Sequence, residues 1–109
     1  MAYSESLADR VRHAFARSPG VEEKRMFGGL AFLRFGRLTV AVFRDSLLAR
    51  LGREGAAEAL KGPDAEPFMN GARPMKGWVL IGPDGIENDA RLAGWIDRAV
   101  EFVGQLPQE

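Results

Sequence analysis

Residues 21–52 read VEEKRMFGGLAFLRFGRLTVAVFRDSLLARLG, a series of short apolar runs separated by glycine and by Asp45-Ser46. Apolar runs of this length, bounded by turn-forming residues, are typical of antiparallel strands joined by hairpins. We therefore expect strands near residues 22–27, 30–35, 38–43 and 47–51, arranged as a meander.

A helix is predicted before this segment. Leu7, Val11 and Phe15 recur at helical spacing, so the pattern predicts a helix over residues 6–17 with Ser6 as its N-cap. Pro19-Gly20 then ends the helical pattern before the first strand.

In the second half of the chain, the residue pattern predicts two helices with one or two strands between them. Residues 53–61 are rich in helix formers, whereas residues 62–74 contain three prolines and are expected to be a loop with a brief strand at Phe68. Residues 76–81, KGWVLI, predict a strand. A last helix is expected after an N-cap at Asn88, because one apolar stripe follows: Leu92, Trp95, Ile96, Ala99, Val100 and Val103.

The order of these elements indicates the fold class. The predicted order is helix, four strands, helix, one or two strands and helix. This order lacks the strand–helix alternation that a parallel sheet requires. We therefore expect a single α+β domain over residues 1–109, with an antiparallel sheet of five to six strands flanked by helices. A chain of this length can bury one self-sufficient core.

The central strands are apolar on both sides. In the strand over residues 30–35, Leu30 and Phe32 point to one face, and Ala31 and Leu33 point to the other. We expect the first and last helices to cover one face and the short middle helix to cover part of the second. The remainder needs a partner, and we expect that partner to be another copy of the chain.

Composition excludes several classes of protein. The chain has 15 basic and 15 acidic residues and no cysteine, so disulfides, thiolate zinc sites and a cysteine nucleophile are absent. The N-terminal residues do not form a secretory signal, and no apolar stretch approaches the roughly 18 residues of a membrane helix. We expect a cytoplasmic protein with no membrane partner.

Candidate catalytic residues are few. His13 is the only histidine, and it falls outside the apolar stripe, which favours a solvated position over catalysis. Without a second histidine or a cysteine it cannot complete a typical zinc site, and no serine lies in a nucleophile-elbow pattern. We expect no catalytic residue, cofactor or metal, although an acid–base pair of distant carboxylates remains an alternative.

Met26, Phe27, Gly28 and Gly29 form a distinctive block. A phosphate-binding loop needs longer glycine spacing and opens onto a helix, whereas another predicted strand follows these glycines. We expect the block to be a structural turn in which glycine adopts positive φ, and Gly29→Val to harm folding for that reason.

Basic and aromatic residues are interleaved in the sheet region: Lys24, Arg34, Arg37, Arg44 and Arg50 occur with Phe27, Phe35 and Phe43. This mixture on a sheet can stack on and bind single-stranded nucleic acid. Strand alternation separates Arg34 from Phe35, which favours core aromatics with a solvated or ion-paired arginine rim. From this set, Arg34, Phe35, Arg37 and Arg50 are the candidates for a partner-binding surface.

Three blocks of sequence resemble the TfoX N-terminal domain family, in its short stand-alone TfoX/Sxy form: KRMFGGLAF, GARPMKGWV and NDARLAGWIDRAV. The resemblance includes the Met-Phe-Gly-Gly block, a leucine-rich strand ending at Arg50, and Trp95 in the last helix. It implies an α+β domain similar to secretion-chaperone-like folds. It also implies regulation, since full-length members assist a transcription activator in natural competence and carry a C-terminal domain that this chain is expected to lack.

The leading hypothesis is therefore a non-enzymatic regulatory or protein-interaction module that forms a homodimer and has a protein partner in transcription regulation. Direct nucleic-acid binding is the alternative, and a small-molecule binder or enzyme ranks third. An affinity for DNA or RNA that falls steeply with salt would favour the alternative, because counterion release accompanies phosphate contacts.

Overall fold

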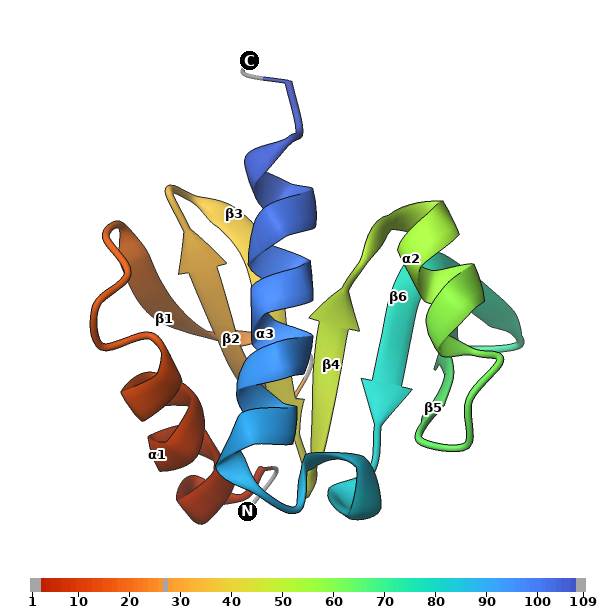
Figure 1. Ribbon diagram of the computed structural model, residues 1–109, viewed down its shortest axis with the longest axis horizontal. Helices are drawn as coiled ribbons and strands as arrows, with labels where there is room; N and C mark the ends of the chain where they lie inside the picture. The colour runs from red at the N-terminus through yellow and green to blue at the C-terminus, as the bar shows by residue number, and fades with distance from the viewer. Residues whose placement is uncertain (1–2, 27, 108–109) are drawn as a thin grey trace.

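The computed structural model describes residues 3–26 and 28–107 and shows an α+β domain built on one antiparallel sheet (Figure 1). Within these residues the elements are, in chain order, α1 (Glu5–Ala14), β1 (Val21–Met26), β2 (Gly29–Arg34), β3 (Arg37–Phe43), β4 (Ser46–Arg50), α2 (Gly52–Ala59), β5 (Ala65–Asn70), β6 (Arg73–Ile81), the 3-10 helix η1 (Pro83–Ile86) and α3 (Asp89–Gly104). The predicted fold class is confirmed.

The strands lie in the order β1-β2-β3-β4-β6-β5, and every neighbouring pair is antiparallel. The first four strands form the predicted meander. Phe35 and Gly36 join β2 to β3 with φ values of 52° and 80°, and Arg44 begins the β3–β4 turn at a φ of 57°. In the β2–β3 turn both central residues have positive φ, which is typical of type I′ turns, whose twist matches that of the flanking strands.

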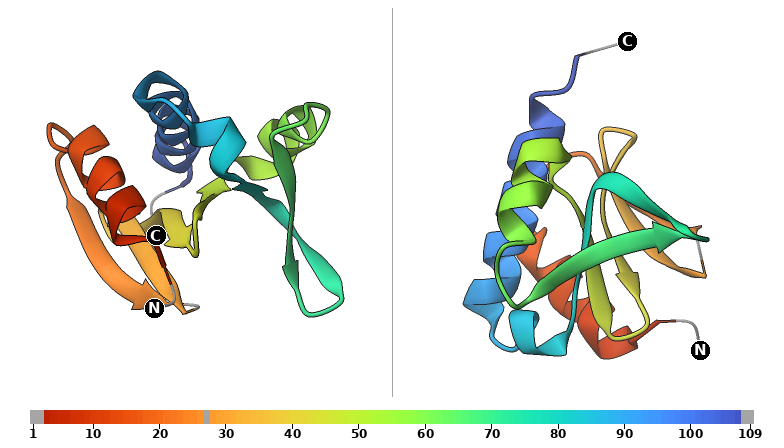
Figure 2. Two further views of the ribbon diagram at one scale, coloured as in Figure 1. Left: turned by 90° about the horizontal axis from the view of Figure 1, so that it is seen from below. Right: turned by 90° about the vertical axis from the view of Figure 1, so that its right-hand side faces the viewer.

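All three α-helices of the described chain pack on one face of the sheet, which we call the helix face (Figure 2). The expectation that the middle helix would cover part of the second face is wrong. Ala56 and Ala59 of α2 belong to the same buried cluster as Leu47 of β4. The direct connection explains this position, because β4 enters α2 through the buried Leu51, whose amide donates to the Gly77 carbonyl of β6 at 2.9 Å.

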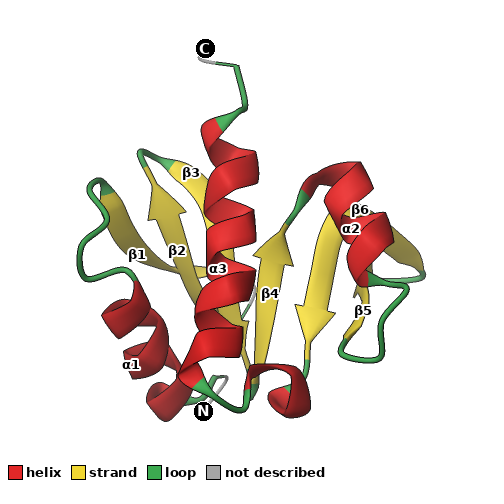
Figure 3. Ribbon diagram, viewed as in Figure 1, coloured by secondary structure: helices red, strands yellow, loops and turns green. Residues whose placement is uncertain are grey.

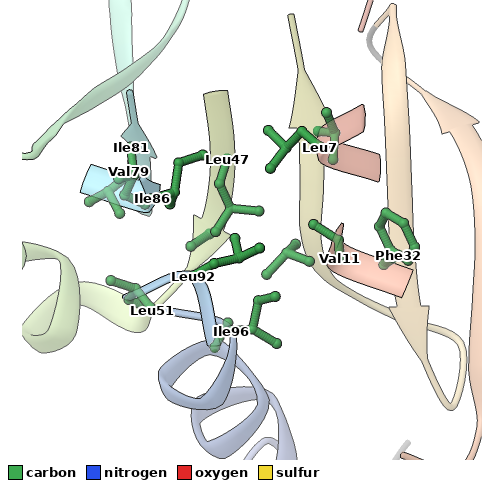
Figure 4. Close-up of a cluster of buried hydrophobic side chains, with 14 of the residues drawn as sticks. Leu7, Val11, Phe32, Leu47, Leu51, Val79, Ile81, Ile86, Leu92 and Ile96 are labelled. Carbon is green, nitrogen blue, oxygen red and sulfur yellow. The ribbon is translucent and has the colours of Figure 1, made fainter. Parts of the chain in front are cut away.

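The main core lies between the sheet and these helices (Figure 4). Leu7 and Val11 come from α1, and Leu92 and Ile96 come from α3. They pack on strand residues that are at most 4% exposed: Leu30, Phe32, Val40, Val42, Leu47, Ala49, Val79 and Ile81. Burial of each large side chain of this kind contributes roughly 1.5–3 kcal/mol of transfer free energy, so this cluster is the main source of stability.

Side chains cap both long helices. Asn88 Oδ1 accepts from the Arg91 amide at 2.9 Å, which confirms the predicted cap of α3. For α1 the expected cap is wrong: Ser4 Oγ, and not Ser6, accepts from the Leu7 amide, at 3.1 Å. Ser4 has the extended backbone that an N-cap requires, and α1 consequently begins at Glu5.

The largest departure from the predicted secondary structure lies in residues 62–74 (Figure 3). Instead of a loop with a brief strand, the chain forms β5, which pairs with β6 at the sheet edge and shifts register between Pro67 and Met69. An edge strand tolerates Pro67 because one side of the strand has no ladder partner that needs the missing N–H.

Candidate functional site: the outer face of the sheet

The face of the sheet opposite the helices, which we call the outer face, carries a second apolar cluster. Ala31, Ala41 and Leu48 lie at its centre and are at most 2% exposed. Partly buried apolar side chains surround them: Met26, Leu33, Leu38, Phe68, Trp78 and Leu80. In the part of the chain that the structure describes, no helix covers this face (Figure 2).

The outer face is concave because the β5–β6 hairpin bends away from the helices (Figure 2). The rings of Phe43 on β3 and Phe68 on β5 pack edge to face, with centroids 6.2 Å apart, although β4 and β6 lie between their strands. In a flat sheet those two strands would be about 14 Å apart. The bend and the converging rings close over the centre of the sheet, which explains how Leu48 is buried without a helix above it.

Arg50 lies at one end of the outer face, directly opposite Trp78 in the β4–β6 ladder. Its guanidinium carbon is 5.7 Å from the centroid of Trp78 and 6.0 Å from that of Phe102, and its Nη1 donates to the Leu38 carbonyl at 3.4 Å. Cation–π contacts are worth roughly 0.5–1 kcal/mol at exposed sites. Arg50 is therefore engaged by its own domain.

The other predicted partner-surface residues lie at the β2–β3 turn, at the end of the sheet where α3 ends (Figure 1). Arg37 donates to the carbonyl of Leu106 at 2.9 Å and also to the carbonyl of Pro107. Phe35 is 66% exposed. The Arg34 guanidinium lies 5.3 Å from the Phe35 ring centroid, and its buried Nε has no hydrogen-bond partner among the described residues.

Arg37 Nη1 also donates to the Val103 carbonyl in the last turn of α3 at 3.4 Å, so the cation has a structural role and opposes the negative end of the helix dipole. The structure thus brings Arg34, Phe35 and Arg37 together at one turn. It leaves the aromatic ring of Phe35 exposed while Arg37 is held by the end of α3.

The block over residues 26–29 connects β1 to β2. Gly28 lies in the connection with a φ of +74°, whereas Gly29 is the first residue of β2 and does not adopt positive φ. The expected reason for the second glycine is therefore wrong. A Cβ on Gly29 would overlap the Val42 carbonyl oxygen of β3, so the position needs a glycine for close strand approach. Phe27 lies outside the described residues.

One ion-pair network links α1 to β1. Arg12 donates to both carboxylate oxygens of Glu23, at 2.7 and 2.9 Å, and to Asp9 at 2.6 Å. The hydrogen bonds from Arg12 lower the pKa of the Glu23 carboxyl below its usual value, and the same contacts raise the pKa of the Arg12 guanidinium. These side chains are more than a third exposed, so solvent screening keeps the contribution of the network to the free energy of unfolding small.

His13 is exposed and lines a cavity of about 480 Å³ between α1 and α3, together with Asp9, Arg10 and Leu92. Across the cavity, Arg10 Nε binds Asp89 at 3.0 Å. Over residues 3–26 and 28–107, no group of three or more His, Cys, Asp or Glu side chains is placed to hold a metal ion.

Trp95 connects α3 to the segment that precedes it. Its Nε1 donates to the Gly85 carbonyl in η1 at 3.1 Å, and the Arg98 guanidinium lies 4.7 Å from the centroid of its ring. Gly85 is closely packed, since a Cβ there would contact Ile81 and Asp64. Trp95 therefore holds η1 against α3, which gives this residue a structural explanation.

The fold and the outer face define a small α+β domain whose helices cover one side of an antiparallel sheet. The chain belongs to the TfoX N-terminal domain family, whose sequence profile matches residues 13–103. A search of curated proteins found no match. None of the helices in the described part of the chain is long and apolar enough to cross a membrane.

Phe68 and Trp78 were not among the predicted residues of a candidate site. The alternation of Trp78 and Leu80 along one strand was the available signal, because two large apolar residues two positions apart point to the same face. Phe68 gave no such signal. Its contact with Phe43 depends on the bend of the β5–β6 hairpin, which no local pattern reports.

Proposed function

We propose that this domain is a non-enzymatic protein-interaction module that acts as a homodimer in a cytoplasmic regulatory system. The observation that carries the proposal is the apolar outer face, where partly buried side chains surround a buried centre. Contiguous apolar surface on a folded domain is typical of protein-contact sites. Phe43, Phe68 and Trp78 belong to the aromatic class that is enriched at protein interfaces.

Family membership supports the regulatory part of the proposal. By resemblance to full-length relatives, we propose that the domain binds a protein of the transcription machinery and contributes to the control of competence genes. The test is to compare transcript levels in cells that carry the wild-type gene, no gene, or a variant with a disrupted outer face. Unchanged transcripts in both altered strains would contradict a transcriptional role.

Phe68→Ser tests the use of the outer face, and Phe35→Ser is the matched control. Both positions carry a phenylalanine, but Phe35 is 66% exposed at a turn whereas Phe68 lies on the outer face. We expect Phe68→Ser to weaken self-association in light scattering and Phe35→Ser to leave it unchanged. The reverse result would assign the contact to the turn at Arg34, Phe35 and Arg37.

Direct nucleic-acid binding is the second candidate, favoured by three arginine–aromatic pairs in the sheet: Arg34 with Phe35, Arg44 with Phe43, and Arg50 with Trp78. The chain has equal numbers of basic and acidic residues, so no net charge attracts a polyanion. Fluorescence anisotropy with labelled single-stranded and duplex DNA distinguishes the candidates. Binding whose affinity falls steeply with salt would favour nucleic acid.

We further propose that the domain has no catalytic activity. A thermal-shift screen with nucleotides and common metabolites is expected to leave the melting temperature unchanged. A reproducible stabilisation that increases with ligand concentration would contradict this part of the proposal, since a ligand that binds the folded state must stabilise it.

A further inference from the structure

We infer that two copies of this chain pack with their outer faces together about a two-fold axis parallel to the strands, so that Lys24 of each copy meets Glu66 of the partner subunit. The inference rests on the proposed function, because it names the geometry of the same face. It follows from one registered row of side chains and from the directions that a two-fold axis can take relative to a sheet.

One row of residues crosses the outer face from edge to edge. The pairing register places side by side, in order, Lys24, Ala31, Ala41, Leu48, Leu80 and Glu66. Directly opposed residues of antiparallel strands point to the same face, and the four central members belong to the outer-face cluster. The row therefore has an exposed cation at the β1 edge, an apolar middle, and an exposed anion at the β5 edge.

An axis perpendicular to the sheet would join two edges into a continuous sheet. If such an axis joins two β1 strands, one residue of β1 pairs with the same residue of the second copy. The four middle residues of that strand are all charged and exposed: Glu22, Glu23, Lys24 and Arg25. Registers centred on Glu22 or Arg25 oppose like charges without compensation, whereas those centred on Glu23 or Lys24 set one like pair against two opposite pairs. At the β5 edge, Pro67 removes a ladder donor, and a joint at either edge would leave the apolar outer face uncovered.

An axis that brings the outer faces together lies in the interface, and its two limiting directions are across the strands and along them. An axis across the strands places β1 over β1 and β5 over β5 of the second copy. If it passes through the row, it opposes Lys24 to Lys24 and Glu66 to Glu66. If it is moved by one residue along the strands, Lys24 faces Glu22 of the partner subunit, but Glu66 has no opposite charge. An axis along the strands reverses the strand order of the second copy. Lys24 then faces Glu66 of the partner subunit at both rims, so this direction gives both charged ends of the row an opposite charge.

The shape of the face agrees with this choice. Because the outer face is concave, its two edges extend toward a facing copy, and the charged ends of the row lie on those edges (Figure 2). The aromatic side chains of Phe43, Phe68 and Trp78 occupy the space between the edges. Two symmetric ion pairs would thus close the rims of an apolar contact, and the strand order places the axis between β3 and β4.

Charge exchange tests the arrangement. Lys24→Glu and Glu66→Lys are each expected to weaken the dimer roughly tenfold in sedimentation equilibrium, because each turns two attractive contacts into repulsive ones. The double variant Lys24→Glu/Glu66→Lys restores opposite charges and is expected to recover the wild-type dissociation constant. Arg25→Glu, on the same strand but the opposite face, is the matched control and is expected to have no effect.

Cysteine cross-linking tests the axis directly. Because the chain has no cysteine of its own, any disulfide must form between the introduced residues. A mixture of Lys24→Cys and Glu66→Cys proteins is expected to form a disulfide-linked dimer under mild oxidation. Lys24→Cys alone is expected to remain uncross-linked, because its two copies lie at opposite rims. A cross-link in Lys24→Cys alone would overturn the proposed axis.

The outcomes separate this inference from the proposed function. A wild-type dimer that is insensitive to the single charge reversals, or not rescued by the double variant, would overturn the arrangement and leave a homodimer that uses another surface. A wild-type protein that remains monomeric at every concentration would overturn both this arrangement and the homodimer of the proposed function.

Discussion

Phe43 and Phe68 are in edge-to-face contact even though two strands of the sheet separate the strands that carry them. Their contact joins the β5–β6 hairpin to the meander on the outer face and gives this side of the sheet its own small core. The helix face has no part in that contact. The stability of the hairpin can therefore be tested separately from the main core.

A double-mutant cycle measures this contact. Phe43→Ala and Phe68→Ala are each expected to destabilise the domain, with a coupling free energy of about 0.5–1.5 kcal/mol, as for other aromatic pairs. Urea denaturation of the four proteins at one low concentration gives the value. The pair Phe35→Ala and Phe68→Ala serves as the control and is expected to be additive. Additivity in the first cycle would show that the hairpin does not bend as described.

Gly29→Ala is expected to be more destabilising than Gly28→Ala. At Gly29 a methyl group overlaps the Val42 carbonyl oxygen, and displacing strand backbone costs about 1–3 kcal/mol. At Gly28 the space is open, and the cost of positive φ for alanine is about 1–2 kcal/mol. Thermal melts of the two variants give the ranking. A larger loss for Gly28→Ala would contradict the close approach of β2 and β3.

Arg37→Ala is expected to loosen the end of α3. The substitution removes charge-assisted hydrogen bonds to the carbonyl of Val103 in the last turn of α3 and to those of Leu106 and Pro107 after it. Bonds of this kind are worth about 1.5–3 kcal/mol each when buried and less at the surface. Amide hydrogen exchange is expected to increase in the last turn of α3 and to stay unchanged in α1. Arg37→Lys should recover only part of the protection, because lysine lacks the planar guanidinium fork. Unchanged exchange in Arg37→Ala would show that the contacts contribute nothing.

The lowered pKa of the Glu23 carboxyl predicts how the free energy of unfolding changes with pH in acid. Its pKa is lowered in the folded state by hydrogen bonds from Arg12, so the folded protein binds this proton less tightly than the unfolded chain. The stabilisation is present above the unfolded pKa and is lost as the pH falls through the folded pKa. Glu23→Gln is expected to flatten the acid side of the stability curve, measured by urea denaturation at several pH values.

Glu22→Gln is the matched control for the acid dependence, because Glu22 is the neighbour of Glu23 and points to the opposite face of β1. It is expected to leave the slope of the curve in acid unchanged. If both variants had the same slope as the wild-type protein, the Arg12–Glu23 contact would have no role in acid stability.

The local features of this fold were predictable because each depends on a few neighbouring residues. The α3 stripe, its Asn88 cap and the meander from Val21 to Arg50 all follow from periodicity and turn chemistry. The errors occurred where local signals competed or were weak. Ser6 was predicted as the N-cap of α1, whereas the cap is Ser4. The edge strand β5 was predicted mostly as loop because it contains Pro67, and proline normally indicates the absence of a strand.

The candidate site was only partly predictable, for a different reason. Strand alternation revealed that the sheet has two apolar faces, and the outer-face cluster of Ala31, Ala41 and Leu48 agrees with that pattern. The predicted residues Arg37 and Arg50 instead make contacts within their own domain, to the end of α3 and to Leu38. Such contacts join residues that are far apart in the chain, so the sequence pattern around each arginine contains no sign of them.

The amino-acid sequence was sufficient to specify an α+β domain with an antiparallel sheet, because its hydrophobic periods, helix caps and turn residues indicate the order of the helices and strands. Two features required the folded arrangement. The side of the sheet on which α2 lies depends on how the chain leaves β4, where Leu51 donates to Gly77 of β6, and the contact of Phe68 with Phe43 across two strands depends on the bend of the β5–β6 hairpin. Both result from packing between distant segments, where volume and contact in three dimensions outweigh local preference.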